Sequence, residues 1–297
     1  MSRALQRREN IAGYLFLLPS LIFFISFVVI PMIICIFLSL TDANMHGSGL
    51  FGNFIGLANF TRLFQDATFL DALKNTFIIV IVSVPTVCAF SLWVSSAIYR
   101  LSGPVLSAFR CIFYLPVVTG SVAVTVVWKW MYDNYNGIFN HVLKGAGLIE
   151  KNINWLGDTK YALWCIILIL FTTSVGQPIV LYVSALGNVD TTLVEAAQVD
   201  GANDFQVFWK VKWFQMLPTT LYILVITTIN SFQCFALIQL LTKGGQGTNT
   251  VMYHIYWTAF KLTEQAGHFG YANAMGVVLA IFIGLLSALQ FKLAKEK

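Results

Sequence analysis

The chain has 297 residues, of which 58% are hydrophobic and only 10% are charged, with a formal net charge of +5. Soluble domains carry about 25% charged residues, so the composition excludes a soluble protein and indicates an integral membrane protein. The positive charge is spread over loops and ends without a dense basic run, which excludes a nucleic-acid-binding protein.

Six apolar segments are long enough to cross a bilayer, which takes about 20 residues in a helix. In none of them do apolar and polar residues alternate, as they do in the strands of a membrane β-barrel. We therefore predict an all-α polytopic membrane protein with a single transmembrane domain over residues 1–297. The predicted spans run over approximately residues 11–40, 75–99, 108–131, 161–186, 219–241 and 272–293.

The first span follows Arg3, Arg7 and Arg8, and this arrangement resembles a signal peptide. The apolar run is too long for the h-region of a cleaved signal, and no small-residue cleavage site follows Leu40. We therefore predict an uncleaved first span.

Basic residues predict the orientation. The N-terminus, the 100–110 loop, the segment 187–218 and the C-terminal tail are short, and together they hold ten of the 18 Lys and Arg residues. Because Lys and Arg collect in short cytoplasmic segments, we expect both termini and the 187–218 segment to be cytoplasmic.

Spans four and five contain polar residues at mid-membrane depth, where each costs energy unless it has a partner or a function. The sequence leaves two interpretations open, a path for a polar substrate or polar packing between helices. The polar and small residues are Thr172, Thr173, Ser174, Gly176 and Gln177 ahead of Pro178 in span four, and Thr227, Thr228, Asn230, Ser231 and Gln233 in span five.

Between these spans lies a polar island over residues 195–218, EAAQVDGANDFQVFWKVKWFQMLP, whose charges exclude a position in lipid. Thr192 and Glu195 have the spacing of a capping box. Gly201 lies where the first helix would end, at a position that often has a positive φ and favours glycine. Asn203 with Gln206 would start a second helix. We predict a bent helix–turn–helix on the cytoplasmic side, with Phe205, Phe208 and Trp209 anchoring its second half to the membrane face.

No catalytic or metal-binding pattern is found. The five Cys lie in or beside different spans without CxxC spacing, the four His are scattered, and GxxxxGK[ST] is absent. We predict that the chain is not an enzyme and holds no metal or cofactor itself.

The run EAAQVDGANDFQVFWKV, in which three residues separate Glu195-Ala196-Ala197 from Gly201, resembles the EAA loop of the membrane subunits of bacterial binding-protein-dependent ABC importers. The likeness is to the carbohydrate branch, which includes maltose-, glycerol-phosphate- and multiple-sugar-type permeases. It extends over nearly the whole chain through Trp128-Lys129-Trp130-Met131-Tyr132, Gly137, Asn140, Asn154-Trp155-Leu156-Gly157, Leu241-Thr242, Gly244-Gly245, Tyr253, Ile255-Tyr256 and Ala259-Phe260.

The resemblance implies that the island is a coupling helix that docks on a separate ATPase subunit. The implied coupling residues are Glu195, Ala196, Ala197, Asp200, Gly201 and Ala202. The implied partners are a second homologous permease, two cytoplasmic ATP-binding subunits that carry ATP and Mg²⁺, and an extracellular solute-binding protein. The expected location is the bacterial cell membrane, and the expected substrate is a sugar, an oligosaccharide.

The resemblance also implies a substrate path through spans four and five, because similar stretches line the sugar pocket of the maltose-type permease. The positions that match or adjoin those stretches are Thr172, Val175, Gly176, Gln177, Ile179, Thr227, Asn230, Ser231 and Cys234. Alternatives are an importer of a polyol or sugar phosphate and an ion-coupled secondary transporter. The latter would carry inverted repeats and mid-span charges, which the sequence lacks.

The sequence departs from the family pattern in two places. Trp213 and Phe214 stand where the family usually has Leu-Pro, so the chain is free to stay helical into span five. Gln246 stands where Pro often follows Gly-Gly.

Overall fold

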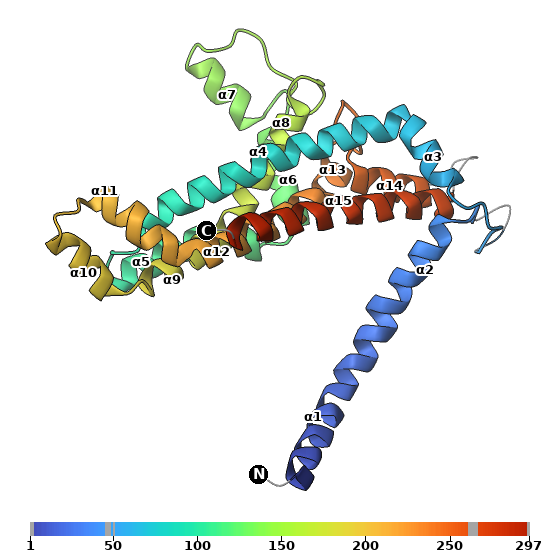
Figure 1. Cartoon of the computed structure of the whole chain (residues 1–297). Coiled ribbons are helices and arrows are strands. Elements are labelled where there is room, and N and C mark those ends of the chain that lie inside the picture. Colours follow the sequence, from blue (N-terminus) through green and yellow to red (C-terminus); the bar gives the residue numbers. More distant parts are fainter. Residues whose placement is uncertain (1–2, 45–48, 50, 261–266, 296–297) are drawn as a thin grey trace. The chain divides into compact units, whose positions relative to one another are not determined.

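The computed structural model describes residues 3–44, 49, 51–260 and 267–295. Within these residues the regular elements are helices, and the β contacts are isolated bridges, which confirms the all-α prediction (Figure 1). The chain divides into two compact units, residues 1–66 with 255–279 and residues 67–254 with 280–297.

The first unit begins with a long apolar helix made of three consecutive segments, α1 (Arg3–Phe24), the π-helical turn η1 (Ile25–Val29) and α2 (Ile30–Ser39). The helical segment of residues 12–39 is long and apolar enough to cross a membrane. Its most apolar stretch is not buried against any other part of the described chain. The unit also contains α3 (Ala58–Gln65), after which Asp66 accepts a 2.7 Å hydrogen bond from the Tyr271 hydroxyl.

The second unit is a helical bundle, and α14 (Val251–Phe260) and α15 (Phe269–Lys295) each begin in one unit and end in the other. Within the bundle, α4 packs against α9 and α12, α5 against α9, and α6 against α13. Its helices are α4 (Ala67–Ile98), α5 (Gly103–Val118), α6 (Ser121–Met131), α7 (Ile138–Gly145), α8 (Ala162–Ser174), α9 (Gly176–Gly187), α10 (Thr191–Val199), α11 (Asp204–Val207), η2 (Phe208–Lys212), α12 (Trp213–Phe232) and α13 (Ala236–Leu241).

Among the described residues, four helices are long and apolar enough to span a membrane, residues 12–39, 67–98, 204–241 and 269–292. The two other predicted spans are broken helix pairs: α5 and α6 meet at 95° and α8 and α9 at 40°. The count of six is therefore reached if each bent pair is one span. The loop expected over residues 100–110 is also shorter, because α5 already begins at Gly103.

The 95° break has a local cause. Thr119 and Gly120 both adopt extended backbone angles, with ψ of 126° and 140°, so the helical path stops after Val118 and restarts in a new direction. Pro116 lies just before the break, and its ring removes one backbone donor from the last turn of α5.

Packing between α4 and α9 forms the centre of the bundle. Val87, Val94 and Ile98 of α4 meet Val175, Ile179 and Val183 in one buried cluster. Ser91 and Ser95, one turn apart on α4, donate hydrogen bonds to the carbonyls of Val175 and Ile179 at 3.3 and 3.0 Å. Small polar residues of this kind let two helices approach closely within a membrane.

Asn140 organises the segment between α6 and α8. Its side chain is buried, donates to the carbonyls of Asn134 and Ile153, and accepts from the Ile153 amide and the Trp155 indole. These contacts fold α7 and the Trp155 loop onto each other. Asn140 and Trp155, two of the residues that carry the family resemblance, therefore belong to one hydrogen-bonded structure.

The loop before α14 explains the departure at Gln246. Gln246 and Lys243 both have a φ of 51°, and a proline is locked near −65°. A proline at position 246 is therefore incompatible with this turn, and Gln246 belongs to a different loop conformation from the one that a Gly-Gly-Pro sequence would form.

Candidate functional site

The island begins within a short helix, α10, whose first residue is Thr191. Its N-cap is Asp190, whose carboxylate accepts from the Thr192 amide at 2.9 Å and from the Thr192 hydroxyl at 2.7 Å. These bonds, the hydroxyl bond first, lower the pKa of the Asp190 carboxyl. The predicted capping box between Thr192 and Glu195 is wrong, because the helix starts earlier and Thr192 acts as a donor to the true cap.

The end of α10 is a Schellman motif. The Ala202 amide donates to the Ala197 carbonyl at 2.9 Å, and the Gly201 amide donates to the Gln198 carbonyl at 3.0 Å. Gly201 has a φ of +84°, as the sequence predicts, since this conformation is cheap only for glycine.

Directly after the bend, Asn203 and Gln206 start the second helix as predicted, and they do so through a capping box with both reciprocal bonds at 2.9 Å. The bent helix–turn–helix is thus confirmed as local structure, and Figure 1 shows α10 and α11 together at one end of the second unit.

The surface of α10 presents apolar side chains to the surroundings of the chain. Val199 is 88% exposed and Leu193 is 52% exposed. Of the six predicted coupling residues, Glu195, Ala196, Asp200 and Gly201 are exposed, and Ala197 and Ala202 are partly exposed.

The second half of the element runs without interruption into span five. The helical path continues from Asp204 to Phe232, through Trp213 and Phe214 where the family usually has Leu-Pro. Within it, η2 makes a π-helical turn in which the Trp213 amide donates to the Phe208 carbonyl. The replacement therefore has the consequence expected from sequence, a helical exit from the bend.

Two contacts hold this element to the spans, and neither was foreseen. The Asp190 amide donates to Oε1 of Gln215 at 2.9 Å, and the ammonium of Lys212 donates to the Tyr99 hydroxyl at 2.7 Å. Of the predicted aromatic anchors, Phe208 is partly buried and meets the ring of Trp209. Phe205 is 72% exposed within the chain, so its anchoring to the membrane face stays a prediction.

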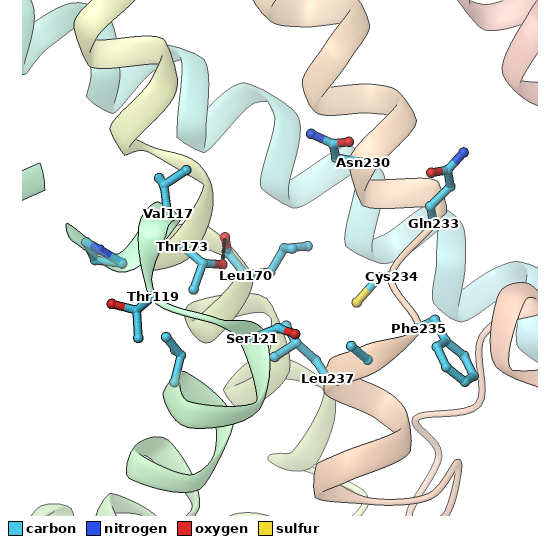
Figure 2. A pocket seen from close by; sticks show the side chains of 13 residues that line it. Val117, Thr119, Ser121, Leu170, Thr173, Asn230, Gln233, Cys234, Phe235 and Leu237 are labelled. Atoms are coloured by element: carbon cyan, nitrogen blue, oxygen red, sulfur yellow. Dashed lines mark hydrogen bonds between the residues drawn. The ribbon is translucent and has the colours of Figure 1, made fainter. Parts of the chain in front are cut away.

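A pocket of about 300 Å³ lies where the break between α5 and α6 faces α8 and the end of α12. Figure 2 shows Asn230 on α12, Gln233 directly after its end, Thr173 on α8, and Thr119 and Ser121 at the break. Asn230 and Gln233 are exposed, and neither amide side chain hydrogen-bonds to another described residue. Both amides are therefore free to bind a polar ligand.

A smaller pocket of about 120 Å³ adjoins the first through Asn230, Val117 and Thr173, and it also contains Gln177 and Thr227. The predicted path residues Asn230, Cys234, Gln177 and Thr227 are thus brought together around two neighbouring pockets.

Of the other predicted path residues, Thr172 lines a third pocket, of about 290 Å³, which shares Pro116, Thr119 and Val124 with the first. Ser231 is buried. Gly176 is also buried, against α5: a Cβ atom there would lie 2.3 Å from the Phe113 carbonyl oxygen. Gly176 and Ser231 line none of these three pockets.

Sequence reasoning missed Thr119 and Ser121, because they appeared to be ordinary polar residues inside a single third span. The signal was present in Pro116 and Gly120, which flank the position of the break. A break in a span exposes the residues beside it to the interior of the bundle.

The chain was compared with known families and proteins. Residues 52–295 match the binding-protein-dependent transport system inner membrane component family. Among similar proteins, the probable ABC transporter permease protein YesP of Bacillus subtilis (strain 168) is 34% identical over 96% of this chain and 91% of its own length. The lactose transport system permease protein LacF of Rhizobium radiobacter is 29% identical over 99% of this chain and 97% of its own length.

The fold also matches a solved structure, that of a bacterial ABC transporter involved in the import of the acidic polysaccharide alginate. The TM-score is 0.83 at 22% sequence identity, covering 99% of each chain. The length of the family match and the identity to YesP agree with the resemblance found in the sequence. The chain belongs to the family of binding-protein-dependent transport system inner membrane components, which are membrane-embedded transport subunits and not enzymes.

Proposed function

We propose that the chain is the pore-forming permease subunit of an ATP-driven importer that translocates a sugar, an oligosaccharide, delivered by an extracellular solute-binding protein. The family description supports the dependence on a binding protein. The similarity to a lactose permease over nearly the full length of both chains supports a carbohydrate substrate.

The coupling role is carried by one observation, the exposed and rigidly bent element around Gly201. Glu195, Ala196, Ala197, Asp200, Gly201 and Ala202 would contact a separate ATPase subunit there. The Schellman motif and the capping box fix the bend through backbone hydrogen bonds, and the exposed Val199 offers an apolar anchor beside it. Because the bend is rigid, a movement of the ATPase subunit would be passed on to the membrane spans.

The substrate path would pass the two polar pockets at Asn230. Their lining residues combine amide and hydroxyl side chains with apolar walls, and none of them is basic. This chemistry suits the hydroxyl groups of an uncharged sugar and supports it over the alternative of a sugar phosphate, whose charge calls for Arg or Lys. Thr172, Gly176, Ser231 and Cys234 would shape the path around these amides.

The remaining parts of the proposal follow from family membership. One chain offers one coupling element, so a second homologous permease and two ATP-binding subunits would complete the importer, with ATP and Mg²⁺ held on those subunits. The distribution of Lys and Arg supports a bacterial cell membrane orientation with both termini cytoplasmic.

Co-purification tests the assembly. Affinity capture of the full-length chain from its native membrane should recover a P-loop ATPase and a second permease. A transport-competent protein that contains this chain alone would contradict the proposal.

Asn230→Leu tests the substrate path. The change removes hydrogen-bonding atoms from both pockets, so we expect roughly a tenfold weaker apparent affinity in uptake, the effect of about one lost hydrogen bond, with the assembled complex intact. Gln239→Leu on α13, outside both pockets, is the matched control. If Asn230→Leu leaves the concentration dependence of uptake unchanged, Asn230 is not in the path.

A further inference from the structure

Lys212 is a cation that the fold removes from water. It is 8% exposed at the end of η2, its ammonium donates to the Tyr99 hydroxyl at 2.7 Å, and its nitrogen lies 5.1 Å from the centre of the Tyr99 ring. Tyr99 follows the end of α4, so this contact joins the coupling element to span two.

A second cation shares the same hydroxyl. Nε of Arg100 donates to Tyr99 at 2.6 Å, and the guanidinium carbon lies 5.4 Å from the ring centre. Two positive groups thus converge on one neutral oxygen. Neither has a carboxylate within ion-pair distance in the part of the chain that the structure describes.

This arrangement is electrostatically incomplete. A buried charge is expensive without a counter-charge, and two like charges on one acceptor repel each other. A phenol oxygen and a ring face stabilise cations only modestly, so the local chemistry calls for an anion that contacts both Lys212 and Arg100.

The surroundings indicate the depth of the site. The rings of Phe208 and Trp213 lie 5.3 and 5.2 Å from that of Trp209, which is 42% exposed. Tryptophan and tyrosine rings concentrate at the level of lipid headgroups, and basic pockets between helices on the cytoplasmic side bind anionic headgroups. A phosphate there would meet both cations.

We propose that Arg100 and Lys212, brought together at Tyr99, form a binding site for a phosphate group, occupied by the headgroup of an anionic phospholipid. The lipid would neutralise the two cations and bind η2 to the end of α4, next to the coupling bend. The placement of this site on the cytoplasmic side of the membrane rests on the proposed function. The binding of lipid does not, because it can be measured without transport.

The test is native mass spectrometry of the full-length protein in detergent, titrated with phosphatidylglycerol or with phosphatidylcholine. The wild type should retain phosphatidylglycerol in preference. Arg100→Gln and Lys212→Met should each weaken that retention roughly tenfold, the loss expected for one charge-assisted hydrogen bond. Lys210→Gln is the matched control, because Lys210 is an exposed neighbour in the same turn that does not contact Tyr99.

Tyr99→Phe separates anion binding from a merely structural contact. It removes the shared oxygen but keeps both cations, so the preference for phosphatidylglycerol should persist. Arg100 is exposed, so Arg100→Gln keeps the test decisive even if Lys212→Met fails to fold.

Equal retention by the wild type and Arg100→Gln would overturn the site. A third arm adds millimolar inorganic phosphate. Displacement of the lipid by free phosphate would overturn the lipid assignment, and lipid that stays bound supports it.

Discussion

Two bends in the chain each contain a glycine, for different physical reasons. Gly201 ends α10 with a φ of +84°, and a Cβ atom there would meet nothing within 4 Å. Gly176 begins α9 in the buried bundle, where a Cβ atom would lie 2.3 Å from the Phe113 carbonyl oxygen and 2.8 Å from a Val117 methyl group. The first glycine serves a backbone angle, and the second serves the close approach of another helix.

The difference extends to the regions around them. The element at Gly201 is held by hydrogen bonds between residues a few positions apart, and its side chains are exposed. The pockets beside Gly176 exist only because α5, α8 and α12, distant in sequence, meet there. A local bend is therefore rigid by itself, whereas the pockets depend on the packing of the whole bundle.

The largest effect is expected for Gly176→Ala. The added methyl group cannot fit beside the Phe113 carbonyl without moving α5, so we expect a loss of about 3 kcal/mol, the upper end of the usual range for overpacking. The thermal unfolding midpoint of the purified protein measures it. Gly187→Ala in the same helix is the matched control, because a Cβ atom there would meet nothing within 4 Å. Equal midpoints for the two variants would mean that the α5–α9 contact is not tight.

A smaller effect is expected for Gly201→Ala, about 1 kcal/mol, because only the backbone angle is penalised. Hydrogen exchange of the α10 amides should measure this loss of stability. If the bend couples ATP hydrolysis to transport, the amount of substrate taken up per ATP hydrolysed should also fall. Asn adopts positive φ more readily than Ala, so Gly201→Asn should recover part of the loss. Identical losses for Ala and Asn would show that the angle is not the cause.

The smallest effect is expected at Asp190 and depends on pH. Hydrogen bonds from Thr192 lower the pKa of this carboxyl, so the ionised cap stabilises α10. That contribution is fully present above the carboxyl's ordinary pKa of about 3.9 and is lost as the pH falls through the lowered value.

The protection factors of the α10 amides in hydrogen exchange should therefore stay constant near neutral pH, where the cap is ionised, and should fall only in acid. Asp190→Ser keeps a cap that does not titrate and should remove that acid dependence, whereas Asp200→Asn should leave it in place. An unchanged acid response in Asp190→Ser would assign the effect to another group.

Local patterns predicted the coupling element well and failed at one point. Gly201 and the Asn203–Gln206 box were found because their hydrogen bonds join residues at most five positions apart. The N-cap was assigned to Thr192 instead of Asp190, since both residue types cap helices and lie two positions apart. The choice is made in the fold, where the Asp190 amide donates to Gln215 and Thr192 donates to the cap.

The pockets were predicted only in part. Asn230, Gln177 and Thr227 stood out because polar residues are costly inside a span. Thr119 and Ser121 did not, because the apolar run was interpreted as one straight span, although Pro116 and Gly120 flank the point where its helix turns by 95°. Gly176 was expected on the substrate path, but its place against Phe113 is a packing contact that no spacing in the sequence reveals.

The sequence by itself determined the membrane class, the apolar segments and the bend at Gly201, because lipid demands long apolar helices and a Schellman motif needs only a few neighbouring residues. The tertiary structure alone decided the pocket at Asn230 and the convergence of Lys212 and Arg100 on Tyr99. Tyr99 and Lys212 lie 113 positions apart. Contacts over such distances depend on how whole helices pack, which short-range patterns in the sequence do not encode.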